Sequence, residues 1–211
     1  MISVPITIPP LENGDRLSRA EFERRYAAMP QLRKAELIEG IVYLMASPLH
    51  VQSHGQPHAQ IMTWLGLYQA SHPQLVLAVE PTVRLDPDNE PQPDAVLFIP
   101  GRHARISPDD YIEGPPELIA EIAASCVSLD LHDKKRAYRR SEVQEYLVWR
   151  TLEQQLDWFH LQADDYVPLD RDPEGIVRSQ VFPGLCLAVP ALLAGDLARV
   201  LAVLNQGLAQ G

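Results

Sequence analysis

Two stretches of sequence decide the fold: QPDAVLFI at residues 92–99 and PELIAEIAAS at residues 116–125. The run AVLFI is short and wholly apolar, which is typical of a strand buried on both faces. Residues 118–123 predict a second strand of the same kind. Each stretch carries an acid, because Asp94 directly precedes the first strand and Glu121 lies inside the second. A carboxylate inside such an apolar run is costly unless it binds a cation or another partner, so the pattern favours a functional role for Glu121, whereas an Asp after Pro, as at Asp94, is more often a turn or cap residue.

The segment after the second strand supplies a cation. Asp130 and Asp133 predict the capped start of a helix that runs to about residue 140. Lys134 lies in this helix, 13 positions after Glu121. Two acids of this kind can hold a divalent metal ion, and an ammonium group beside them can orient water or stabilise an anionic transition state.

The rest of the chain predicts short helices and strands around these two buried strands. Ser18 and Glu21 form a capping-box pattern that opens a helix. We predict the following further elements: an extended arm over residues 1–15, a helix to about 29, two strands in 35–47 joined by a turn at 39–40, a helix over 57–70, a strand pair in 75–85 split at Pro81, a polar loop over 101–116, a hairpin over 145–161, short strands over 166–182 and a C-terminal helix over 190–206. This pattern predicts one α/β domain over residues 1–211, with a central sheet flanked by helices.

The composition excludes several classes of protein. The chain has 211 residues, of which 46% are hydrophobic and 22% charged, so it is not a disordered chain. Its 18 Lys and Arg against 28 Asp and Glu give a formal net charge of −10. That balance argues against a protein that coats nucleic acid through bulk charge, but it allows a nuclease with a local basic rim. The run KKRAYRR at residues 134–140 fits such a rim and fits a solvated helix face equally well.

The sequence also predicts where the protein works. No apolar run approaches the roughly 20 residues that a bilayer-spanning helix needs, and the N-terminus lacks the pattern of a signal peptide. Two cysteines, Cys126 and Cys186, do not make a disulfide framework. A cytoplasmic protein without membrane partners is therefore expected.

Several motifs, taken in order, resemble those of a known family. They are AELIEG, His54, QPDAVLF, PELIAEIAAS, DLHDKKRAYRR and VQEYLVW. This ordered set resembles the PD-(D/E)xK nuclease superfamily and, more narrowly, the Uma-two type of restriction endonuclease, from about residue 21 to 201. The resemblance implies a restriction-endonuclease-like fold of mixed α+β type, in which helices flank a central mixed sheet and further β-hairpins are added.

The resemblance also implies a metal site. Asp94 matches the Asp of the PD element, and Glu121 matches the acid of the following strand. With the main-chain carbonyl of Ile122 they would hold Mg²⁺ or Mn²⁺. The superfamily lysine stands two residues after the second acid, where this chain has Ala123. In this family the lysine moves to the next helix, and Lys134 matches it.

Two further positions match the family, namely Glu36 in the AELIEG strand and His54 shortly afterwards. The chain departs from the family at residues 141–142, where Ser and Glu replace the usual residue and Gly, which indicates a changed helix end. His50, His54 and His58 also have the four-residue spacing of a zinc site. Gly55 and Pro57 are expected to interrupt a helix there, which argues against zinc.

The predicted function is that of a metal-dependent endonuclease acting on DNA. A homodimer is expected, because cleavage of both strands needs two sites, and the apolar C-terminal helix is either its surface or part of the core. One alternative is a non-catalytic DNA- or protein-binding module that keeps the nuclease fold. Another is a hydrolase of a different phosphate ester.

Overall fold

The structure is a computed structural model, and it describes residues 8–45, 50–124 and 127–210. The helical elements are α1 (Arg19–Ala27), the π-helical segment η1 (Val51–Gly55), α2 (Gln56–Ser71), the π-helical segment η2 (Leu129–Lys134), α3 (Lys135–Arg140), α4 (Val189–Leu193) and α5 (Leu197–Leu208). The strands are β1 (Ala35–Ile38), β2 (Ile41–Leu44), β3 (Val76–Val79), β4 (Val83–Arg84), β5 (Ala95–Phe98), β6 (Arg105–Ile106), β7 (Ile112–Glu113), β8 (Leu118–Ala123), β9 (Glu145–Arg150), β10 (Gln155–Gln162), β11 (Asp165–Pro168), β12 (Ile176–Arg178) and β13 (Cys186–Ala188).

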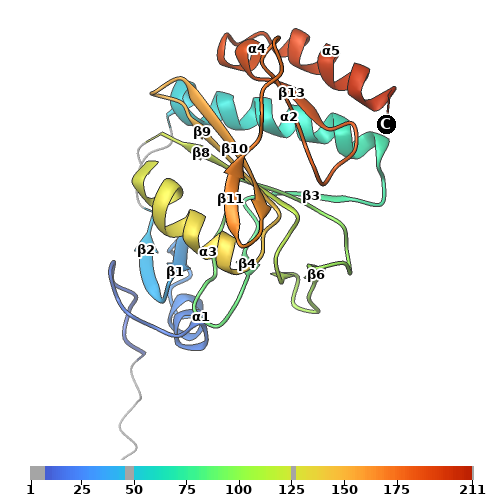
Figure 1. Ribbon diagram of the computed structural model, residues 1–211. Helices are drawn as coiled ribbons and strands as arrows, with labels where there is room; N and C mark the ends of the chain where they lie inside the picture. The colour runs from blue at the N-terminus through green and yellow to red at the C-terminus, as the bar shows by residue number, and fades with distance from the viewer. Residues whose placement is uncertain (1–7, 46–49, 125–126, 211) are drawn as a thin grey trace, which may run out of the picture.

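A central sheet of six strands runs in the order β11-β10-β9-β8-β5-β3. Strands β8 and β9 are parallel, and the other neighbours in this sheet are antiparallel. Figure 1 shows α2, α4 and α5 on one side of this sheet and α3 on the other. The predicted mixed sheet flanked by helices is therefore confirmed, as is the hairpin formed by β9 and β10.

The two faces of the sheet have separate apolar cores. The first lies under α2 and contains its apolar stripe of Ile61, Trp64, Leu65 and Tyr68, all buried. Along β8 the side chains alternate between the faces: Leu118, Ala120 and Ile122 belong to the core under α2, whereas Ile119 and Ala123 belong to the core under α3. Glu121 has the parity of this second set, so its side chain points toward α3.

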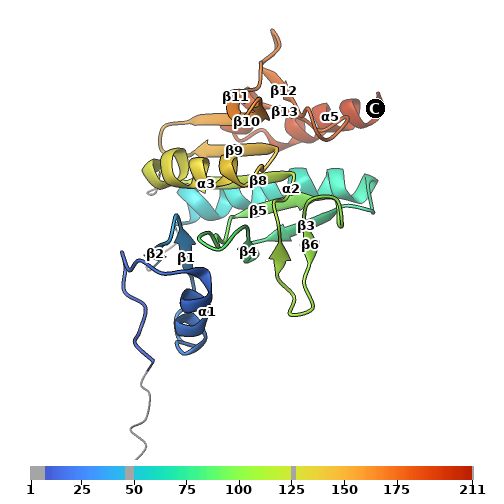
Figure 2. The ribbon, with the colours of Figure 1, turned by 60° about the horizontal axis from the view of Figure 1, so that its bottom comes forward.

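The β1–β2 hairpin lies at one end of the molecule with α1, next to α3 (Figure 2). Its two-residue turn consists of Glu39 and Gly40, which both have positive φ angles (54° and 72°), as a type I′ hairpin turn requires. The antiparallel bridge between Leu37 and Glu90 joins β1 to the segment that leads into β5. Residues 8–15 are irregular and bond to β2, for example from Gly14 N to the carbonyl of Val42 (2.8 Å).

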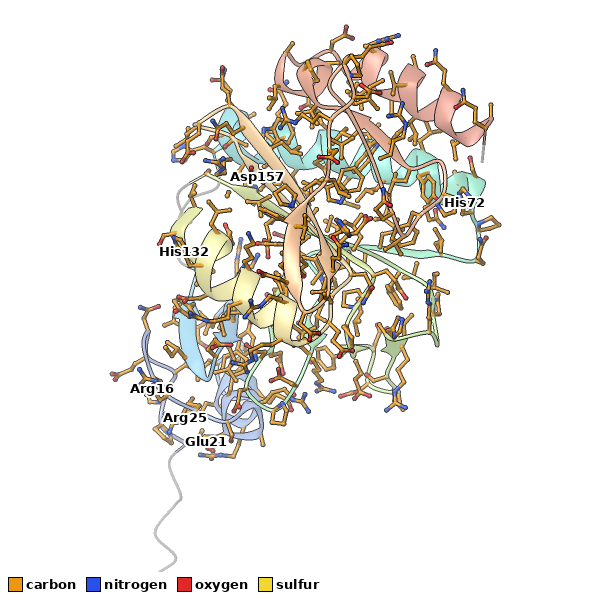
Figure 3. All side chains as sticks on the ribbon, in the orientation of Figure 1. Arg16, Glu21, Arg25, His72, His132 and Asp157 are labelled. Carbon is orange, nitrogen blue, oxygen red and sulfur yellow. The ribbon has the colours of Figure 1, made fainter. Side chains whose placement is uncertain are left out.

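The helix predicted from the capping box exists, but its cap differs. Ser18 stands at the N-cap of α1 with an extended backbone, and its side chain makes no capping hydrogen bond. The Glu21 carboxylate instead accepts a hydrogen bond from Arg24 Nε at 2.7 Å and another from Arg25 Nε, also at 2.7 Å. Figure 3 labels Glu21 and Arg25 side by side. The two guanidinium groups compete for the carboxylate that a capping box would use.

The predicted cap at Asp130 and Asp133 is wrong, because residues 127 and 128 are already helical and η2 contains both acids. Asp130 is 4% exposed and its carboxylate turns inward. The polar loop predicted over 101–116 contains β6 and β7, which form a small sheet with β4.

The single C-terminal helix predicted over 190–206 is also wrong, because two helices, α4 and α5, occupy this region. Gly195 has a φ of +76°, and the Asp196 side chain caps α5 by accepting a hydrogen bond from Arg199 N at 2.9 Å. The apolar face of α5, with Val200 and Leu204, packs into the core under α2. This face is core and is not available as the dimer surface.

None of the described helices is both long enough and apolar enough to cross a bilayer. Of the two cysteines, Cys126 lies outside the described residues, and Cys186 is a buried free thiol.

Candidate active site

The antiparallel pairing of β5 with β8 brings the two predicted acids together. Ala95 pairs with Ala120, so Asp94 and Glu121 are the next pair along the register. Asp94 Oδ2 accepts a hydrogen bond from the amide of Ile122 at 2.6 Å. The two acids are 4% and 3% exposed. The sheet thus buries both carboxylates at one point, beside the N-terminal end of β5.

Lys134 reaches this point from η2. Its Nζ lies 3.0 Å from Glu121 Oε1, 3.0 Å from Glu36 Oε1 and 3.5 Å from Asp130 Oδ1. The lysine is only 2% exposed. One buried ammonium group therefore sits among three buried carboxylates, and the displaced lysine does meet the strand acid.

Glu36 joins the site from β1 and is completely buried. Besides Lys134, its Oε1 accepts a hydrogen bond from the amide of Gln92 at 2.7 Å. Its Oε2 is buried and has no hydrogen-bond partner. Because an unpaired buried carboxylate oxygen is costly, this atom is free to ligate a cation or to accept a hydrogen bond from water.

His54 reaches the same acids from η1. Its Nε2 lies 3.3 Å from Asp94 Oδ1, and His58 Nε2 lies 2.8 Å from the main-chain oxygen of Asp94. The expected interruption of the helix is wrong: Gly55 has helical angles (φ −61°, ψ −44°), and Pro57 is the second residue of α2, directly after the π-helical segment η1. Helical structure therefore continues through both residues and presents His54 and His58 to Asp94.

Sequence reasoning missed two members of the cluster, Asp130 and Tyr138. The Tyr138 hydroxyl donates a hydrogen bond to Glu121 Oε1 at 2.9 Å, and Asp130 is an ion-pair partner of Lys134. The signal for both is their spacing, because residues four apart lie on the same face of a helix. Asp130, Lys134 and Tyr138 form such a row.

Burial of so many acids raises their pKa values. Desolvation, with the negative charges of neighbouring acids, raises the pKa of Glu121 to about 8 against the attraction of Lys134. The same causes raise the pKa of Asp130 to about 6. Burial alone would lower the pKa of Lys134, but Glu121, Glu36 and Asp130 outweigh it and raise that pKa well above its usual value. The ammonium group therefore keeps its charge.

Asp94 behaves differently from the other acids. Burial acts to raise its pKa, but the hydrogen bond from His54, the charge of Lys34 and the amide of Ile122 together lower it. The bond to Asp94 in turn raises the pKa of His54, against desolvation. Asp94 thus stays ionised more readily than Glu121 or Asp130.

The cluster fits a divalent metal ion. Four acids, Glu36, Asp94, Glu121 and Asp130, lie around one lysine, and a divalent cation could replace the proton that burial keeps on Glu121 near neutral pH. The main-chain oxygens of Glu117 and Ala123 accept hydrogen bonds on the β9 side of the strand, from Glu145 in β9 (2.8 Å) and from Thr151 just after it (3.1 Å). Alternate residues of a strand bond to opposite sides, so the carbonyl of Ile122 faces Asp94 instead.

Among the described residues, no group of three or more His, Cys, Asp or Glu side chains could hold a metal ion by itself. The carboxylates of Asp94 and Glu121 with the carbonyl of Ile122 would therefore make only a partial site. A partial site suits Mg²⁺, which usually binds one or two carboxylates and completes its coordination shell with water and substrate phosphate.

The central mixed sheet with its flanking helices is a nuclease-type fold. The structure is similar to the crystal structure of "a putative nuclease belonging to DUF820 from Anabaena variabilis ATCC 29413", with a TM-score of 0.63 and 16% identity over 81% of this chain and 96% of that chain. At this identity the similarity establishes a shared fold. Residues 19–190 match the Uma2 family, described as "Putative restriction endonuclease", and the protein belongs to that family. No curated protein matches the sequence.

Proposed function

We propose that this protein is a metal-dependent endonuclease that hydrolyses phosphodiester bonds in DNA. The supporting observation is the buried Lys134 among Glu36, Glu121 and Asp130, with Asp94 beside them. Membership of the Uma2 family favours the same chemistry.

Asp94, Glu121 and the carbonyl of Ile122 would hold Mg²⁺ or Mn²⁺. Such an ion polarises a phosphate oxygen and lowers the pKa of a nearby water molecule. Ionised Asp94 favours cation binding at neutral pH, and a cation there would also favour ionisation of Glu121.

The other residues act on the phosphate and on protons. In hydrolysis, a water oxygen bonds to phosphorus while the bond to the leaving oxygen breaks, and negative charge grows on the phosphate. The charged Lys134 ammonium stabilises that charge. Glu36 Oε1 fixes the position of Lys134, and its Oε2 can complete a second metal position or bind its water. His54 orients Asp94 and can contact the scissile phosphate or transfer a proton to the leaving oxygen.

Plasmid cleavage in Mg²⁺ or Mn²⁺ tests the proposal. We expect Asp94→Asn and Lys134→Met to abolish cleavage. Asp88→Asn and Lys135→Met are matched controls outside the cluster, and they should retain it. Wild-type activity in both site variants contradicts the assignment. DNA binding by the wild-type protein without cleavage in either metal favours the non-catalytic binding module, and cleavage of model phosphodiesters without DNA cleavage favours a different substrate.

The proposed enzyme acts as a homodimer, because cutting both strands of a duplex requires two sites. Sedimentation equilibrium measures the assembly, and the ratio of linear to nicked plasmid early in the reaction measures paired cutting. A monomer that only nicks DNA would contradict this part of the proposal.

A further inference from the structure

The β1–β2 hairpin carries a lysine, Lys34, that makes no ion pair with the acids of the site described above. The amide of Met45 donates to the carbonyl of Lys34 at 3.1 Å, so the strand pairing extends one residue before β1. Residues two apart in a strand share a face, which places Lys34 on the face of Glu36. Tyr43 pairs with Glu36 across the hairpin, and its hydroxyl contacts Asp133 at 3.3 Å. This face of the hairpin therefore points toward η2 and the buried cluster.

The pairing of β1 with the segment before β5 shows which residue of that segment lies opposite Lys34. Leu37 and Glu90 exchange two backbone hydrogen bonds, of 3.2 and 2.8 Å, as an antiparallel pair. Because antiparallel residue numbers run in opposite directions, the same register brings Lys34 level with Pro93, next to Asp94. The amide of Gln92, which bonds to Glu36 Oε1, agrees with this register.

Lys34 lies near the site but is not neutralised by an ion pair within the described part of the chain. It is partly buried and forms no ion pair with any described residue, whereas Lys134 has three such partners. Its positive charge acts to lower the pKa of both Asp94 and His54. A free cation at this point is notable in a chain with a net charge of −10.

We propose that the amine of Lys34 binds a phosphate of the DNA strand that lies at Asp94. This inference rests on the proposed function and adds a substrate contact to it. A lysine amine is a compact point charge that suits a phosphate oxygen. The contact gives an acidic protein a local positive group where the strand must approach carboxylates, which would otherwise repel it.

Equilibrium binding of a fluorescent DNA duplex, measured by anisotropy over a series of NaCl concentrations, tests the contact. The variants are Lys34→Met and Lys34→Arg. Arg33→Met is the matched control, because Arg33 is the adjacent exposed cation and points to the opposite face of the strand. We expect Lys34→Met to weaken binding about tenfold and to reduce the slope of log affinity against log salt by about 0.9, the loss of one phosphate contact. Lys34→Arg keeps most of the affinity, and Arg33→Met changes neither quantity.

Two results overturn the inference in different ways. If the wild-type protein binds DNA and Lys34→Met has the same affinity and slope, Lys34 contacts no phosphate while the proposed function stands. Equal losses in Lys34→Met and Arg33→Met also overturn it, because they indicate diffuse attraction. If the wild-type protein neither binds nor cleaves DNA, the proposed function and this inference fail together. Circular dichroism of each variant confirms that the fold is intact.

Discussion

The Nζ atom of Lys134 lies 3.0 Å from Glu121 Oε1, although 13 residues and a change from strand to helix separate them. The residue that the superfamily spacing would make a lysine is Ala123, which is buried in the core under α3. Glu121 points to the same side, and η2 with α3 covers that side. A helix lysine can therefore deliver its ammonium group to the strand carboxylate without a lysine in the strand itself.

The first prediction concerns the stability of this ion cluster. Lys134→Met keeps the side-chain bulk but leaves Glu36, Glu121 and Asp130 buried without their cation. Loss of one partner from a buried ion cluster costs about 3–5 kcal/mol, so we expect a loss of this size in the free energy of unfolding, measured with urea. In the control, Lys135→Met, the lysine removed has its Nζ over the ring of Phe159 at 3.5 Å, and the loss should stay near 1 kcal/mol or below. Equal stability of the two variants would contradict the structure.

Much of the fold follows from local sequence patterns. The apolar runs of β5 and β8, the stripe of α2 and the turn at Glu39 and Gly40 are set by residues close in sequence, and the structure agrees with each. The element boundaries that failed depend on distant partners. Asp130 does not cap a helix because its carboxylate pairs with the Lys134 ammonium group, which Glu36 and Glu121 of other elements hold inside the protein.

The residues of the candidate site also differ in whether the sequence alone identifies them. Glu121 is visible in the sequence because an acid inside a buried strand is unusual, whereas Asp94 follows a proline as many turn residues do and is selected by the family resemblance. Lys134 is not distinguishable on local grounds from the other cations of KKRAYRR, and only the family resemblance selects it. The four-residue spacing places Tyr138 on the helix face of Lys134, but its hydrogen bond to Glu121 depends on how that helix packs against β8. Lys34 depends on the register of β1 with the segment before β5, which no local pattern reveals.

The second prediction separates the role of Tyr138 from simple stability. Tyr138→Phe removes the hydroxyl that donates to Glu121 Oε1. Tyr166→Phe is the matched control, because its buried hydroxyl donates to the carbonyl of Val143 at 2.9 Å, away from the cluster. Each variant should lose about 1–2 kcal/mol of unfolding free energy. Only Tyr138→Phe should change metal affinity, measured by calorimetry, because it frees Glu121 Oε1. The same metal affinity in both variants would argue against Glu121 as a ligand.

The third prediction concerns metal binding. If Asp94 and Glu121 hold the ion, Mg²⁺ or Mn²⁺ stabilises the folded protein by mass action, by about 2.7 kcal/mol at a concentration 100 times the Kd. Thermal unfolding should show a rise in Tm for the wild-type protein and for Asp88→Asn. The rise should be absent in Asp94→Asn and in the Asp94→Ala, Glu121→Ala double variant. A rise that persists in the double variant would place the metal elsewhere.

The fourth prediction concerns pH and a carboxyl pair outside the candidate site. Glu90 is 4% exposed. Burial, together with the hydrogen bond to Glu23 and the charge of that residue, raises its pKa from 4.5 to about 8, against the attraction of Arg84 and Arg19. The folded protein therefore keeps a proton on Glu90 that the unfolded chain releases above about pH 4.5.

Stability linked to this proton is fully present at low pH and is lost as the pH rises from about 4.5 to about 8. The loss is at most about 1.4 kcal/mol per pH unit for one proton. Glu90→Gln carries a permanent neutral donor, so it should match the wild-type protein near pH 5 and exceed it in unfolding free energy near pH 8. Glu174→Gln, at an exposed site, should follow the wild-type profile. Urea unfolding across this pH range measures all three proteins. Parallel profiles for Glu90→Gln and the wild-type protein would mean that Glu90 is ionised in the folded state and that Arg84, rather than a shared proton, balances the pair.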